Sequence, residues 1–242
     1  MTLFLLLIGL ALSGAILIAW EHRIHSRAAV ARRRGWLKYG VYLVYLGAMI
    51  SVRWWGWWPA TFLIGLLACA ASWEAACLLR RRPLVAISVV TLIVAGLASL
   101  LQLEPAHWSA VILLVAVADS YAQLIGRLIG RRPLCPKLSP GKTVEGMLGG
   151  VLGALVLSVV FLALWPDRGL GAGLGIFLLI GAVTALVATA GDLFFSLIKR
   201  RCGVKDFSQS IPGHGGVLDR IDSLVFAAPV FFCVIQMMSS AS

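Results

Sequence analysis

The sequence predicts an all-α, polytopic integral membrane protein with about eight transmembrane helices. Of its 242 residues, 60% are hydrophobic and only 13% are charged, and the mean hydropathy is +0.95. Soluble domains have about 45–50% apolar and about 25% charged residues, so this chain carries more apolar surface than a soluble core can bury. Apolar runs near the length of about 20 residues that a bilayer-spanning helix needs recur along the whole chain.

The eight apolar runs are the expected transmembrane segments. They lie at 2–20, 39–52, 57–79, 84–103, 106–125, 144–165, 169–195 and 223–238. The second and the last are the weakest. The first run is long for the apolar region of a signal peptide and no basic residues precede it, so we expect it to be a retained span.

The basic residues fix the orientation expected for these spans. With the N-terminus outside, the inner segments hold 19 of the 21 basic residues, and only Arg53 and Arg168 lie outside. The positive-inside rule therefore places both termini away from the cytoplasm. The net charge of +11 follows this alternation between spans, so we expect no nucleic acid partner.

Acidic residues gather in the inner segments of the second half, which marks the candidate site. Asp119 and Asp192 each end an apolar run, at the inner edge of the hydrocarbon. Ionisable groups are costly there and usually face a polar cavity. If the helix continues through Asp192, Ser196 and Lys199 follow on the same face and present a carboxylate, a hydroxyl and an ammonium group together.

A second acidic pair follows a glycine-rich turn. Asp219 and Asp222 are three residues apart on one helical face, and the turn at 211–217 holds three glycines around His214. Paired carboxylates with open coordination suit Mg²⁺, and closely approaching backbone N–H groups suit an anion. Taken alone, the turn is weak evidence, and a histidine in the position of His214 is more often a structural hydrogen-bonding residue.

The other inner loop, 126–146, combines basic side chains, hydroxyls and a Pro140–Gly141 turn ahead of a helix. It is a plausible phosphate cradle but not a P-loop, because the Walker sequence is absent and no strand is expected before it. By itself the loop is equally compatible with an ordinary positive-inside signal.

Together these segments resemble a known family. Ser196-Leu-Ile-Lys199-Arg200, Lys205-Asp206 and Pro212-Gly-His214-Gly215-Gly216-Val-Leu-Asp219-Arg220-Ile-Asp222 span 27 residues and resemble the signature of the phosphatidate cytidylyltransferase family. Ser139-Pro-Gly-Lys142-Thr143-Val-Glu145-Gly146 is similar to a second landmark, and Asp119 with Gly126 and Gly130 to a third. The chain departs from the pattern at Phe195, where an acidic residue is expected, and at Tyr121 to Gln123.

The resemblance implies roles for residues by position. It implies that Asp192, Asp219 and Asp222 hold a divalent metal, Mg²⁺, and that Lys199 acts with them in catalysis. Whether a second, monovalent cation also binds is left open by the resemblance. The residues it implies for substrate binding are Asp119, Ser139, Lys142, Thr143, Glu145, Lys205, His214, Gly215, Gly216 and Arg220.

The resemblance also implies a function and a division of the chain. Residues 1–105 would form an N-terminal transmembrane region of about four spans, and 106–242 the catalytic transmembrane region. We expect a nucleotidyltransferase of phospholipid biosynthesis in a bacterial-type inner membrane, with CTP and phosphatidic acid as substrates and its site facing the cytoplasm. A CTP-dependent lipid alcohol kinase, or a non-catalytic transporter or scaffold, is the alternative. A homodimer is one option for the oligomeric state.

Overall fold

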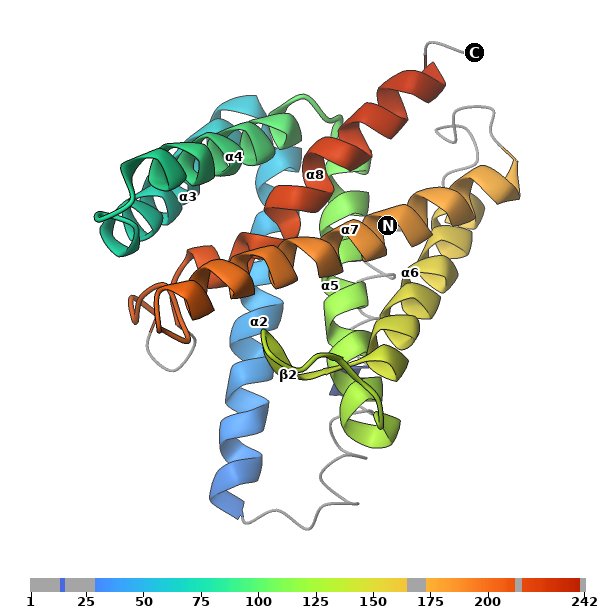
Figure 1. The fold of residues 1–242 in the computed structure, drawn as a ribbon. Coiled ribbons are helices and arrows are strands. Elements are labelled where there is room, and N and C mark those ends of the chain that lie inside the picture. The colour runs from blue at the N-terminus through green and yellow to red at the C-terminus, as the bar shows by residue number, and fades with distance from the viewer. Residues whose placement is uncertain (1–13, 16–28, 165–172, 212–214, 240–242) are drawn as a thin grey trace. The chain divides into compact units, whose positions relative to one another are not determined.

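The computed structural model describes residues 14–15, 29–164, 173–211 and 215–239 (Figure 1). The chain divides into two compact units, Met1–Ser51 and Val52–Ser242. Most of helix α2 (Ala29–Trp55) belongs to the first unit. The second unit holds α3 (Trp57–Leu78), α4 (Pro83–Leu101), α5 (Pro105–Ile129), β1 (Pro133–Cys135), β2 (Ser139–Thr143), α6 (Val144–Leu164), α7 (Leu174–Arg201) and α8 (Leu218–Ser239).

Six of the described helices, α3 to α8, are long and apolar enough to cross a membrane. Of the expected span 2–20, only residues 14–15 are among the described residues. The expected span 39–52 lies within α2, which is not one of the six. Lys38 and Arg53 bound an uncharged stretch of 14 residues there, which is shorter than the about 20 that a spanning helix needs. The expected number of about eight spans is therefore not confirmed.

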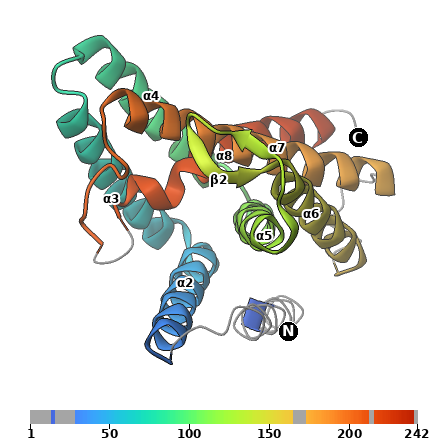
Figure 2. The same ribbon diagram turned by 60° about the horizontal axis from the view of Figure 1, so that its bottom comes forward.

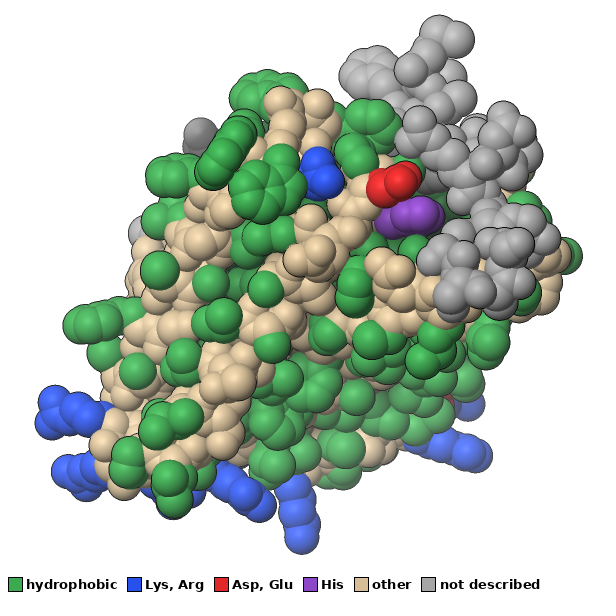
Figure 3. All heavy atoms as spheres, turned by 90° about the horizontal axis from the view of Figure 1, so that it is seen from above, with side chains coloured by type: hydrophobic (Ala, Val, Ile, Leu, Met, Phe, Trp, Pro, Cys, Tyr) green, Lys and Arg blue, Asp and Glu red, His purple; other side chains and the backbone are tan. Residues whose placement is uncertain are grey.

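Local sequence explains where two of these helices begin. Pro83 and Pro105 occupy the first turn of α4 and α5, where a missing backbone N–H breaks no helical hydrogen bond. Hydrophobic side chains cover much of the face shown in Figure 3, and Lys and Arg side chains project along one edge of it. Such an apolar surface suits lipid as the surrounding solvent.

The fold departs from all-α in one place. Strands β1 and β2 pair antiparallel, with Pro133 opposite Thr143 and Cys135 opposite Ser139. The expected tight turn at Pro140–Gly141 is therefore part of a strand, and this strand leads directly into α6. The expectation that no strand precedes this helix was wrong.

Within the second unit, α5 packs against α6, α7 and α8, while α4 packs against α3 and α8 (Figure 2). Glycines let α5 and α6 approach closely. A Cβ atom at Gly146 would lie 2.5 Å from the Ala122 carbonyl oxygen, and one at Gly150 would lie 2.6 Å from that of Ala118. Small residues at such interfaces allow helix backbones to meet in a membrane. This contact fixes β2, at the start of α6, beside α5.

Candidate active site

Helix α7 presents the expected polar stripe. It is continuous from Leu174 to Arg201, so Asp192, Ser196 and Lys199 lie on one face, as the sequence predicted. The Ser196 hydroxyl donates a hydrogen bond to Asp192 Oδ1 at 3.3 Å. Ser196 and Lys199 are buried, each with 8% of its surface exposed. A buried ammonium group needs anionic partners, and α8 supplies them.

Lys199 joins the two carboxylates of α8. Its Nζ lies 2.6 Å from Asp219 Oδ1 and 3.9 Å from Asp222 Oδ2. The same ammonium group lies 5.4 Å from the ring centre of Phe207, within the range of a cation–π contact. The link between α7 and the start of α8 is therefore a buried, charge-assisted one.

Asp219 also organises the loop that precedes it. Its Oδ2 accepts backbone N–H groups from Phe207 at 2.9 Å and from Gly216 at 3.0 Å. Gly215 has a φ of 83°, a left-handed conformation that favours glycine. Ile211 and Gly215 form an isolated antiparallel bridge. One carboxylate thus ties both ends of the loop to Lys199.

Glu74 on α3 holds the same loop from the other side. It is buried, with 6% of its surface exposed. Its Oε1 accepts hydrogen bonds from the Ser208 and Ser210 hydroxyls, both at 2.6 Å, and from the Val217 N–H at 3.0 Å. Its Oε2 accepts the Leu218 N–H at 2.9 Å. The carboxylate therefore satisfies two unpaired N–H groups at the start of α8, where negative charge is favoured.

The hairpin brings a second lysine to the stripe. Lys142, on β2, forms an ion pair with Asp192 Oδ2. Arg200 Nε, near the end of α7, donates to the Leu138 carbonyl oxygen at 3.1 Å and fixes the hairpin against the helix. Strand β2 therefore delivers an ammonium group to the Asp192 carboxylate.

Two hairpin residues have structural contacts. The Thr143 hydroxyl accepts the Gly146 N–H at 3.1 Å, a cap for the first turn of α6. Glu145 Oε2 accepts the backbone N–H groups of Arg131 at 3.0 Å and Arg132 at 3.1 Å. These contacts shape the loop, and Ser139 lies at the other end of β2.

Asp119 completes the cluster from α5. Its carboxylate interacts electrostatically with Asp192 and Lys142 and is hydrogen-bonded to the Ser223 side chain. Asp222 is buried and interacts electrostatically with Asp192, Lys199 and Asp119. Carboxylates from α5, α7 and α8 thus converge near the two lysines.

The comparison with protein families decides where this chain belongs. A family model described as "Cytidylyltransferase family" matches residues 5–238, nearly the whole chain. The chain belongs to the cytidylyltransferase family. The resemblance read from the sequence is confirmed at this level.

Several curated members of the cytidylyltransferase family are similar to the chain. A phosphatidate cytidylyltransferase from Haemophilus influenzae is 48% identical over 126 residues, covering 50% of this chain and 42% of the relative. One from Aquifex aeolicus is 48% identical over 118 residues, covering 49% and 42%. One from Pseudomonas aeruginosa is 37% identical over 181 residues, covering 75% and 59%. The chain spans less than half the length of the first two relatives.

The cluster supplies carboxylate oxygens, which are the ligands that a divalent cation such as Mg²⁺ prefers. Asp119, Asp192, Asp219 and Asp222 carry four carboxylates against the two ammonium groups of Lys142 and Lys199, leaving a formal charge of −2. Among the described residues, however, no three His, Cys, Asp or Glu side chains form a ready metal-binding group. Asp192 is paired with Lys142, and both oxygens of Asp219 have donors. The lysine ammonium groups thus contact carboxylate oxygens that would otherwise be available to a cation.

The other predicted residues form no ion pair with this cluster among the described residues, or reach it only through the backbone. The side chains of Lys205 and Arg220 are exposed, and no ion pair joins them to the four carboxylates in the described part of the chain. Gly216 contributes through its backbone N–H to Asp219. The prediction for His214 lies outside the described residues. Phe195, which stands where the family pattern suggested an acid, is fully buried against Phe207 and Phe226.

The role of Glu74 was not predicted from the sequence. The only signal was an acidic residue within an apolar run, which is costly in a membrane and implies a polar partner. Its partners could not be identified from the sequence, because two of them are backbone N–H groups more than 140 residues away.

Proposed function

We propose that this chain is a phosphatidate cytidylyltransferase that forms CDP-diacylglycerol and pyrophosphate from CTP and phosphatidic acid. The observation that carries the proposal is the convergence of Asp119, Asp192 and Asp222 with Lys142 and Lys199. Family membership and the names of the curated relatives support the choice of reaction.

In the proposed reaction, an oxygen of the lipid phosphate attacks the α-phosphorus of CTP. A new P–O bond forms there, and the bond from the α-phosphorus to the α–β bridging oxygen breaks as pyrophosphate leaves. The attacking phosphate is already ionised, so little base catalysis is needed. Positioning and charge neutralisation carry the acceleration.

Lys142 and Lys199 are the residues that would receive the triphosphate. Each ammonium group is held by a carboxylate before substrate arrives, which keeps it aimed at the cluster. A triphosphate competes for these ammonium groups and frees carboxylate oxygens on Asp192 and Asp219. Bound Mg²⁺ would neutralise phosphate charge, held by Asp192, Asp219 and Asp222 with Asp119 close by.

Orientation and location belong to the same proposal. We place the site at the cytoplasmic face of a bacterial inner membrane, because 19 of 21 basic residues fall in the predicted inner segments. The basic residues at 127–142 would attract anionic headgroups to that face. A homodimer and a second, monovalent cation stay predictions.

The deciding experiment follows the α-phosphorus. Purified protein in detergent receives phosphatidic acid, Mg²⁺ and CTP labelled at the α or the γ position. We expect α label in the lipid, γ label in pyrophosphate, and no transfer in EDTA. Lipid labelled from the γ position, with a lipid alcohol as acceptor, would make the protein a kinase. No transfer from either position would favour a transporter or scaffold.

A further inference from the structure

A groove lies between α4 and α7, away from the carboxylate cluster. Its volume is about 510 Å³, within the range of about 300–1,000 Å³ that is usual for ligand pockets. Its apolar lining includes Leu84, Val85 and Val89 from α4 and Phe194, Leu197 and Ile198 from α7. The two helices pack mainly on other partners, α4 on α3 and α8, and α7 on α6 and α8. The space between them is therefore open to an apolar ligand.

One end of the groove is cationic. Arg82 immediately precedes α4, Arg201 is the last residue of α7, and both line the groove and are exposed. Neither guanidinium group forms an ion pair or a hydrogen bond with the described residues. The α3–α4 turn and the end of α7 lie on the same side of the second unit (Figures 1 and 2). The groove thus combines two unpaired cations with a long apolar wall.

This pattern matches one kind of ligand. A phospholipid has an anionic phosphate at one end and acyl chains that lie along the membrane-spanning segments. Arginine binds phosphate oxygens through a fixed fork of donors. We infer that the groove binds an anionic glycerophospholipid, with its phosphate at Arg82 and Arg201 and its acyl chains along α4 and α7.

The lipid in this groove is not the reacting one. Successive residues of an α-helix turn by about 100°. Phe194, Leu197 and Arg201 therefore face the opposite side of α7 from Asp192, Ser196 and Lys199. A lipid held there is separated from the carboxylates by the helix itself. The inference is independent of the proposed function, because it concerns binding of a lipid that does not react.

Native mass spectrometry of the full-length protein in detergent tests the inference. The probes are phosphatidylglycerol and phosphatidylethanolamine with identical acyl chains, because phosphatidic acid would also occupy the proposed reaction centre. We expect the protein to retain phosphatidylglycerol in preference. Each arginine near a membrane surface favours binding of anionic lipid. The R82Q/R201Q variant should therefore bind phosphatidylglycerol about tenfold or more weakly.

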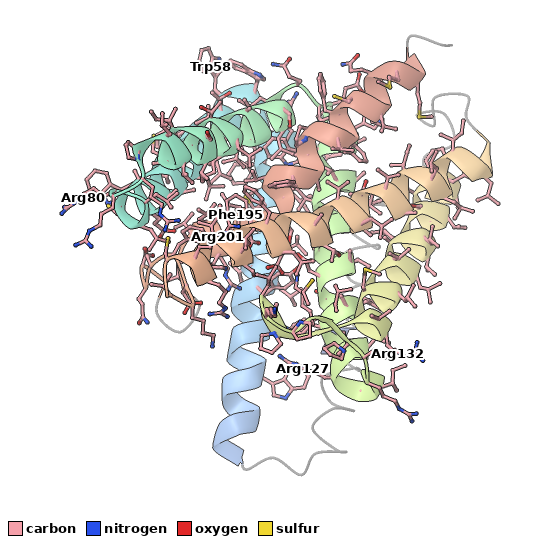
Figure 4. All side chains as sticks on the ribbon, in the orientation of Figure 1. Trp58, Arg80, Arg127, Arg132, Phe195 and Arg201 are labelled. Atoms are coloured by element: carbon pink, nitrogen blue, oxygen red, sulfur yellow. The ribbon has the colours of Figure 1, made fainter. Side chains whose placement is uncertain are left out.

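Two further variants make the result specific. R80Q/R81Q removes the same amount of charge, from the turn that also holds Arg82. Arg80 projects outward (Figure 4), and neither residue lines the groove, so binding should be unchanged. Val85→Trp leaves the charge intact but fills the groove, so binding should fall. Equal binding of the two lipids, an equal loss in R80Q/R81Q, or unchanged binding in both R82Q/R201Q and Val85→Trp would overturn the inference. Disulfide cross-linking between Val85→Cys copies would also overturn it, by assigning the groove to a protein interface.

Discussion

Glu74 and Leu218 are 144 residues apart in the chain, yet the Glu74 carboxylate accepts the Leu218 backbone N–H at 2.9 Å. Helix α3 thereby sets the position of the start of α8, which carries Asp219 in its first turn and Asp222 one turn later. The N-terminal half of the second unit is thus more than a membrane anchor, because it fixes two carboxylates of the candidate site.

Replacing Glu74 with Gln should loosen this attachment. Gln retains one carbonyl oxygen, but its NH₂ group faces an N–H donor and the charge that favours the helix start is lost. The cost should be about 2–3 kcal/mol of the free energy of unfolding. Hydrogen exchange of the Val217 and Leu218 amides should accelerate. Glu104→Gln is the control, because Glu104 is exposed and makes no side-chain cap. Equal exchange in both variants would contradict the assignment.

Asp192→Asn, Asp219→Asn and Asp222→Asn should each abolish turnover while leaving the protein folded. Loss of a group that stabilises the transition state by several kcal/mol corresponds to about 10³-fold or more in rate. Asp206→Asn removes a nearby acid and should have a much smaller effect. Initial rates of lipid labelling at saturating Mg²⁺ measure this. A near-normal rate for Asp219→Asn would refute its role at the metal.

Asp219→Asn should differ from the other two variants in a second property. Asp219 accepts N–H groups from Phe207 and Gly216, whereas Asp192 accepts none from the described residues of the loop. Proteolysis of the loop should therefore increase in Asp219→Asn and not in Asp192→Asn. The same susceptibility in both would show that the loop does not depend on Asp219.

Lys142→Met should impair CTP binding far more than Lys137→Met. Both lysines lie in the hairpin segment, but only Lys142 pairs with Asp192, and Lys137 is exposed. We expect a raised KM for CTP together with a reduced kcat, since a charge that meets the triphosphate is lost. The comparison with Asp192→Asn uses the dissociation constant of CTP, because that variant should not turn over. In the double variant, the loss of CTP binding free energy should be smaller than the sum of the two single losses, because the residues are in contact. Strict additivity would argue against their coupling.

The predicted orientation can be tested with Val204→Cys in a background without the five native cysteines. The basic residues place 204 on the cytoplasmic side, so an impermeant thiol reagent should modify it in inverted vesicles only. Modification from outside intact cells would show that the predicted orientation is wrong.

The sequence predicted the features that depend on helical periodicity. Asp192, Ser196 and Lys199 share a face because 3.6 residues per turn places them there. Long-range partners were harder to predict. The Lys142–Asp192 pair depends on how a loop folds back across 50 positions, and backbone donors such as the Leu218 N–H leave no signature. The strand at Ser139–Thr143 was missed because proline and glycine are depleted in strands. Its shape depends on pairing with β1 and on Glu145, which holds the N–H groups of Arg131 and Arg132.

The two carboxylates that hold the segment 207–218 bind mainly its backbone. Glu74 and Asp219 together accept the N–H groups of Phe207, Gly216, Val217 and Leu218. Every residue except proline supplies such a group. Exposed residues of this segment, such as Gln209, can therefore change while these four anchoring hydrogen bonds are kept. Proline at any of the four anchor positions is the substitution that this arrangement forbids. Single substitutions at exposed positions of the segment can accordingly change its surface while the hydrogen bonds to Glu74 and Asp219 stay in place.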